Sequence, residues 1–113
     1  MGLLSKLLPK KNNDISFECE ITGGWAECKK DPKTKRHDVL MPLPVGTALK
    51  LEQDYYKNAP YFLICAPNGL DLGAMPSEYN QKIRASYPNS PLSAVLIDKT
   101  NETHAIMRVT IHI

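Results

Sequence analysis

Long apolar runs, a strong net charge and abundant aromatic side chains are all missing from this sequence. No apolar stretch approaches the ~18 residues that a membrane-spanning helix needs. Fourteen Lys and Arg against twelve Asp and Glu leave a net charge of +2, which is too small to indicate a nucleic-acid partner by itself. Two Phe and one Trp mean that aliphatic side chains and Tyr must build most of the core.

The composition that remains is that of one folded domain. The chain is 42% hydrophobic and 23% charged, which is ordinary for a folded protein and excludes global disorder. Its 113 residues have room for one domain, and such a chain buries roughly 65% of the surface that its unfolded form exposes. We expect this domain over residues 15–113, preceded by a tail or short helix over residues 1–14.

Cysteines are also few, and Cys19, Cys28 and Cys65 make an odd number that does not suit a disulfide framework. The N-terminal leucines do not form the apolar core of a secretory signal, because Lys6 interrupts them. Unpaired thiols are the rule in a reducing compartment. We therefore expect a cytoplasmic protein.

Leu3, Leu4, Leu7 and Leu8 have a spacing that suits one face of a short helix beside lysines. Pro9 limits such a helix to the residues before it, which bury too little area for stable membrane insertion. A tail, or a helix packed on the domain, is the preferred interpretation. The leucines also offer a surface to a protein partner.

Strands are predicted along most of the chain by the period-two alternation of apolar and polar residues. The continuous apolar run 61–65 is typical of a strand covered on both sides, and Asn68-Gly69 favours the positive φ angles of a hairpin turn. The short strands 25–28 and 38–41 are expected to flank a polar loop as a hairpin. The predicted strands are 15–21, 25–28, 38–41, 47–52, 61–65, 70–75, 92–98 and 105–113.

One helix is predicted, over residues 77–86. Ser77 is a suitable N-cap, Glu78 suits the positive end of the helix dipole, and Pro88 follows the expected end. Antiparallel strands this numerous in a short chain favour a barrel, because closure removes exposed sheet edges. The predicted fold class is mainly β: a small OB-like or SH3-like antiparallel β-barrel of six or seven strands with one helix.

Catalytic and metal-binding patterns are weak. Eight residues separate Cys19 from Cys28, whereas zinc knuckles place about two to four residues between ligands. The chain has no Gly-x-Ser-x-Gly, no phosphate-binding Gly-rich loop and no His-Glu-x-x-His. Cys65 with His104 is a conceivable nucleophile and base, but any chain with three of each residue offers such pairs, and Asp71 is expected on a solvated strand face. We expect no metal, no cofactor and no enzymatic activity.

Basic and aromatic residues give the strongest functional signal. One polar loop holds five cations that suit phosphate neutralisation through counterion release: Lys29, Lys30, Lys33, Lys35 and Arg36. A second segment holds the candidates for base stacking and backbone contact: Tyr55, Tyr56, Lys57, Asn58 and Tyr61. The alternative is that the loop is a solvated hairpin tip and that the tyrosines cap the barrel.

Much of the chain resembles the HIRAN domain. A strand ending in glycine at 17–23 precedes the family's Asn-Ala pair, here 58–59, and an apolar strand at 61–65. Residues 68–76, Asn-Gly-Leu-Asp-Leu-Gly-Ala-Met-Pro, are similar to the family's Gly-x-x-Ile-Gly-Tyr-Val-Pro segment, which leads into a helix. The resemblance covers residues 15–113.

The resemblance implies a small OB-like barrel that captures the 3′ end of single-stranded DNA. Family members use aromatic and basic side chains and the loop before the Asn-Ala pair, which here implies Tyr55, Tyr56, Lys57 and Asn58. The family's Asn-Pro-Tyr-Asp run is absent, and Ala74 stands where many members have Tyr. The leading hypothesis is non-catalytic binding of single-stranded DNA. The competing hypothesis is a protein-interaction or scaffold barrel without nucleic-acid affinity.

Overall fold

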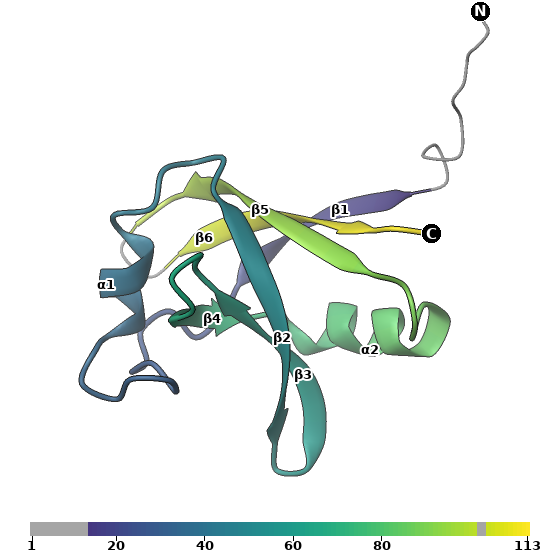
Figure 1. Ribbon diagram of the computed structural model, residues 1–113, viewed down its shortest axis with the longest axis horizontal. Helices are drawn as coiled ribbons and strands as arrows, with labels where there is room; N and C mark the ends of the chain where they lie inside the picture. The colour runs from purple at the N-terminus through teal and green to yellow at the C-terminus, as the bar shows by residue number, and fades with distance from the viewer. Residues whose placement is uncertain (1–13, 102–103) are drawn as a thin grey trace, which may run out of the picture.

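Six antiparallel strands and two helices make up the computed structural model, which describes residues 14–101 and 104–113 (Figure 1). The elements are β1 (Ile15–Ile21), α1 (Arg36–Leu40), β2 (Ala48–Tyr56), β3 (Ala59–Cys65), β4 (Asp71–Ala74), α2 (Ser77–Ser86), β5 (Leu92–Lys99) and β6 (Ala105–Ile111). The strands form one sheet in the order β1-β6-β5-β2-β3-β4. The mainly β, barrel-like prediction is confirmed, and the helix at 77–86 has the predicted bounds. The four N-terminal leucines lie outside the described residues.

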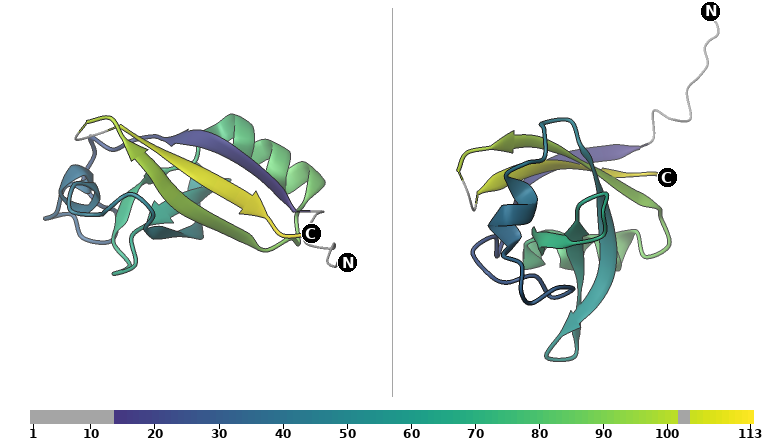
Figure 2. Two further views of the ribbon diagram at one scale, coloured as in Figure 1. Left: turned by 90° about the horizontal axis from the view of Figure 1, so that it is seen from above. Right: turned by 60° about the vertical axis from the view of Figure 1, so that its left-hand side comes forward.

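Alternating side chains give the sheet an inner and an outer face. In β6, Ala105, Met107, Val109 and Ile111 are buried, and the residues between them are half-buried or exposed. Figure 2 shows the strands curling around this core, with α2 beside them. Phe17 of β1 stacks on Tyr79 of α2 with ring centroids 4.9 Å apart, so α2 closes the core on the side of β1.

The barrel closes only partly where β1 and β4 meet. Beyond the end of β1, Thr22 forms an isolated bridge with Ala74, and their backbone groups exchange two hydrogen bonds of 2.8 Å. Gly73 permits this approach, because a Cβ there would lie 2.4 Å from Cγ2 of Ile21 and 2.6 Å from the carbonyl oxygen of Thr22. A larger residue at position 73 would therefore force the two strands apart.

A second seam lies between β2 and β5. These strands pair only through Ala48 and Leu49 of β2, whereas β2 from Lys50 to Tyr56 pairs with β3. The two strands then leave the body as a hairpin arm, residues 53–62 (Figure 1). Lys57 and Asn58 form its turn with positive φ angles of 50° and 67°, as a tight hairpin turn requires.

The hairpin predicted for residues 25–41 is wrong, because neither 25–28 nor 38–41 forms a strand. Residues 36–40 form α1 instead of a strand, and a single bridge between Glu27 and Lys35 remains of the expected pairing. The reason is that α1 buries Arg36, Val39 and Leu40 against the core. One helical turn places these side chains on the interior, which a strand at the same position does not.

Asp71 holds residues 24–36, the 24–36 loop, from inside the barrel. Its carboxylate accepts a hydrogen bond of 2.8 Å from Nε of Arg36 and bonds of 2.9 and 3.0 Å from the backbone N–H groups of Lys29 and Lys30. Burial alone raises the pKa of Asp71, but these three donors together hold it below its usual value. Asp71 is fully buried, so its expected place on a solvated strand face is wrong.

Candidate functional site

A groove of about 960 Å³ lies between the hairpin arm, the 24–36 loop and α2. Ala74 and Met75, at the end of β4, contribute to its lining. Tyr56, Ala59, Pro60 and Tyr61 line it from the hairpin arm, and Ser77, Asn80, Gln81, Arg84 and Ala85 line it from α2. The groove therefore joins the predicted aromatic segment to a helix that the sequence reasoning left out of the site.

Tyr55 and Tyr56 lie on opposite faces of the hairpin arm, because successive residues of a strand alternate. Tyr56 shares the groove with Tyr61, is 66% exposed, and has Nζ of Lys57 5.4 Å from its ring centroid. Tyr55 lies on the other face, where its hydroxyl accepts a hydrogen bond of 2.7 Å from Nε2 of Gln53. The two tyrosines, both of them candidates for base stacking, are thus separated, and of the two only Tyr56 lines the groove.

Tyr61 is held at the edge of the groove by Asp54 and Lys29. The Tyr61 hydroxyl donates to Oδ2 of Asp54 at 3.0 Å and accepts from Nζ of Lys29 at 3.3 Å. Nζ of Lys29 also lies 2.6 Å from Oδ2 of Asp54. This hydrogen bond lowers the pKa of Asp54 and raises the pKa of Lys29, so both groups remain charged at neutral pH.

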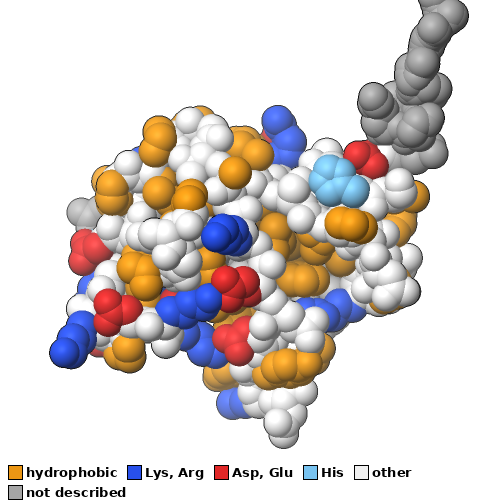
Figure 3. Space-filling model, viewed as in Figure 1, with side chains coloured by type: hydrophobic (Ala, Val, Ile, Leu, Met, Phe, Trp, Pro, Cys, Tyr) orange, Lys and Arg blue, Asp and Glu red, His pale blue; other side chains and the backbone are white. Residues whose placement is uncertain are grey.

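Acidic side chains accompany the lysines on this face, where red and blue groups lie side by side in Figure 3. Lys30 forms an ion pair with Glu52 of β2, next to the pair between Lys29 and Asp54. The two lysines remain partly exposed, with 44% and 36% of their side-chain surface accessible. A phosphate must therefore compete with a carboxylate for each of them.

The five cations predicted to contact phosphates occupy three different environments. Arg36 is 7% exposed and its charge is balanced by Asp71, so the prediction of an exposed cation is wrong at this position. Lys29 and Lys30 are exposed but paired. Lys33 and Lys35 are exposed and form no ion pair among residues 14–101 and 104–113.

Polar side chains of α2 hold the hairpin arm in place, and sequence reasoning missed them. Nδ2 of Asn80 donates to the carbonyl oxygen of Pro60 at 2.8 Å. Nε of Arg84 donates to Oδ1 of Asn80 and its Nη1 to Oε1 of Gln53, both at 2.9 Å. The Arg84 guanidinium carbon lies 4.4 Å from the centroid of Phe62. The available signal was the i,i+4 spacing of Asn80 and Arg84, which puts them on one helix face.

No thiol or histidine is among the residues that line the groove. Cys65 is fully buried, and burial raises its pKa to about 11, while His104 contacts Glu20 at 3.0 Å. All three cysteines are buried and unpaired. Within the described ranges, no three His, Cys, Asp or Glu side chains gather as a metal site, and no helix has the length and apolarity to cross a bilayer. The groove itself combines stacking surface with amide, hydroxyl and guanidinium groups.

Comparison with known proteins identifies the fold alone. No protein-family model matches the chain, and no curated protein is significantly similar to it. A crystal structure of a protein from Lactobacillus plantarum, solved by the Northeast Structural Genomics Consortium, superposes with a TM-score of 0.63 over 87% of this chain and 96% of that one. The two sequences are 14% identical. The small partly closed barrel is therefore an architecture that the two chains share.

Proposed function

We propose that this barrel binds single-stranded DNA in the groove between the hairpin arm and α2, without catalysing a reaction. The observation that carries the proposal is the exposed ring of Tyr56, which borders the groove beside Lys57 and opposite the polar side chains of α2. Stacking of a base on an aromatic ring contributes about 1–3 kcal/mol and tolerates any base. The HIRAN resemblance of residues 15–113 supports the same ligand.

Phosphate contacts are assigned to the cations that can reach a ligand. Lys57 lies next to the Tyr56 ring, and Lys33 and Lys35 are exposed on the 24–36 loop. Lys29 contributes once a phosphate replaces Asp54 as its partner. Each phosphate neutralised on a single strand adds about 0.7 to the slope of log affinity against log salt, so the proposed affinity falls as salt rises.

The proposal extends to a free 3′ end, following the HIRAN resemblance. A terminal 3′-hydroxyl both donates and accepts hydrogen bonds. Ser77 and Gln81 are exposed residues of α2 that line the groove and supply matching groups. We place this activity in the cytoplasm, where the unpaired thiols stay reduced.

Fluorescence anisotropy with a labelled single strand of about 12 nucleotides tests the proposal. Tyr56→Ala removes the stacking surface, so we expect about tenfold weaker binding, the equivalent of about 1.4 kcal/mol. Tyr55→Ala is the matched control on the opposite face, and its affinity should stay within twofold of the wild type. Equal losses in the two variants would contradict a site on the Tyr56 face.

Varying the salt concentration and blocking the 3′ end in the same assay distinguish capture of the strand end from nonspecific electrostatic binding. Weaker binding at moderate salt and with a blocked 3′ end is the expected result. Binding that ignores the 3′ block removes the end-capture part of the proposal. No binding even at low salt would favour the second candidate, a protein-interaction barrel, for which the apolar lining by Ala26, Ala59, Pro60, Met75 and Ala85 is the supporting observation.

A further inference from the structure

Arg84 carries a positive charge that no carboxylate balances among the described residues. Its Nε and Nη1 donate only to the neutral amides of Asn80 and Gln53, and its flat guanidinium lies over the ring of Phe62. Nη2 is buried and has no hydrogen-bond partner. Leaving a buried donor of a charged group unpaired is unfavourable. The Arg84 guanidinium therefore lacks a hydrogen-bond acceptor for Nη2 and a negative charge to balance its own.

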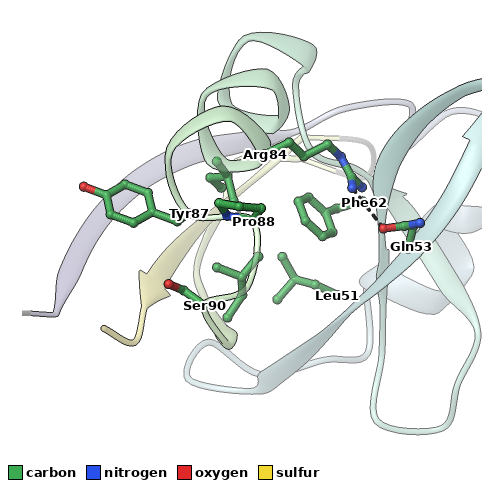
Figure 4. Close-up of a pocket in the computed structure, with 9 residues that line it drawn as sticks. Leu51, Gln53, Phe62, Arg84, Tyr87, Pro88 and Ser90 are labelled. Carbon is green, nitrogen blue, oxygen red and sulfur yellow. Dashed lines mark hydrogen bonds between the residues drawn. The ribbon is translucent and has the colours of Figure 1, made fainter.

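A pocket of about 230 Å³ opens beside this guanidinium, at the seam where β2 and β5 stop pairing. Figure 4 shows Arg84 and Gln53 joined by a hydrogen bond above the pocket, with Phe62 and Leu51 below them and Pro88 on the opposite side. An engineered apolar cavity of about 150 Å³ holds benzene. This pocket thus has room for one ring, or a short branched chain, together with a small head group.

We infer that this pocket binds a small carboxylate with an apolar body. The carboxylate accepts hydrogen bonds from Nη1 and Nη2 of Arg84 as a bidentate pair, the geometry that a guanidinium fork favours. Gln53 is exposed, so its side chain can move aside and uncover both nitrogen atoms. The apolar body packs against Leu51, Phe62 and Leu92.

Arg84 lines both this pocket and the groove, but the inference does not rest on the proposed DNA site, which uses the Tyr56 face of the hairpin arm and assigns Arg84 no phosphate. Gln53 and Leu51 lie on the other face, since residues of one strand alternate. The same carboxylate chemistry occurs in a free acid and in the C-terminal residue of a peptide. Phenylacetate represents the first source and N-acetylphenylalanine the second, so comparing their affinities distinguishes them.

Titration of the ¹⁵N-labelled full chain with phenylacetate, followed by NMR, tests the inference. We expect saturable shifts of the backbone amides of Gln53, Phe62 and Leu92. Phenylacetamide has the same shape without the charge, so we expect it to bind at least tenfold more weakly. Equal shifts with the two compounds, shifts elsewhere on the surface, or no saturable shifts with either acid would overturn the inference.

Arg84→Gln provides the mutational test. Loss of charged hydrogen bonds should weaken phenylacetate binding at least tenfold. Lys82→Gln is the matched control, because it removes the same charge from an exposed position of α2 and should leave binding unchanged. If Arg84→Gln does not fold, Arg84→Lys keeps the charge but loses the fork, and wild-type affinity in that variant would count against bidentate binding.

Discussion

Of the three ion pairs that hold the 24–36 loop, Arg36–Asp71 and Lys29–Asp54 differ in burial far more than in length. Arg36 and Asp71 lie 2.8 Å apart with 8% and 0% of their side chains exposed, whereas Lys29 and Asp54 lie 2.6 Å apart with 44% and 31% exposed. Water and salt screen the exposed pair. Removing one partner of the buried pair leaves a desolvated charge. The shorter pair is therefore expected to be the weaker one.

Arg36 and Lys29, two cations of the same loop, therefore have different roles. Arg36 fixes the position of the loop against the barrel, and Asp71 adds backbone hydrogen bonds to Lys29 and Lys30. Lys29 is held at the surface, where a phosphate can replace Asp54. Arg36, at the end of the loop, is thus a structural anchor, whereas the Lys29 side chain, nearer the middle of the loop, is accessible to a ligand.

Asp71→Asn should have the largest effect on stability of the substitutions in these ion pairs. The amide offers one oxygen to three donors and places its own N–H groups against them, while Arg36 loses its counter-charge. We expect the free energy of unfolding to fall by about 3–5 kcal/mol, measured by urea denaturation. A loss no greater than that of Asp54→Asn would show that burial does not distinguish the two pairs.

Lowering the pH should reduce the difference in stability between the wild type and Asp71→Asn. The pKa of Asp71 is held below its usual value of 3.8, so its charge stabilises the fold fully above that value and loses this effect as pH falls through the folded-state pKa. Urea midpoints measured from pH 6 to pH 2.5 should converge below about pH 4. Parallel curves over this range would mean that another group carries the acid sensitivity.

Asp54→Asn should have the smallest effect on stability but should change the affinity for DNA. The exposed pair contributes less than about 1 kcal/mol after screening, so the urea midpoint should change little. Lys29 loses its carboxylate partner and becomes available to phosphate, so affinity for the labelled single strand should rise a few-fold in the anisotropy assay. Reduced affinity would argue that the Asp54 contact positions Tyr61 for binding.

Local patterns predicted most of the strands and α2. Alternation over seven or more residues reports one buried face, as in β1 and β6, and the Asn68-Gly69 turn follows from backbone preference. By contrast, α1 has five residues, too few to show a helical period. The contact between Arg36 and Asp71 joins positions 35 residues apart, which no local pattern reveals, and the loop was therefore interpreted as a solvated hairpin.

The candidate site was only partly predictable, because it depends on where β2 ends and on contacts between residues far apart in the sequence. The strand extends to Tyr56, four residues beyond the predicted end at 52. Strand alternation then places Tyr55 and Tyr56 on opposite faces, a result that a loop interpretation conceals. The roles of Asn80 and Arg84 depend on Pro60 and Gln53, which reach them through the tertiary fold.

DNA binding between the hairpin arm and α2 is tested most directly by mapping the bound strand on the ¹⁵N-labelled protein by NMR, with the 12-nucleotide single strand at low salt. We expect the largest shifts on amides lining the groove, including Ala59, Asn80 and Gln81. Shifts confined to the loop around Lys33 and Lys35 would indicate counterion binding alone. That result would contradict a binding site between the hairpin arm and α2.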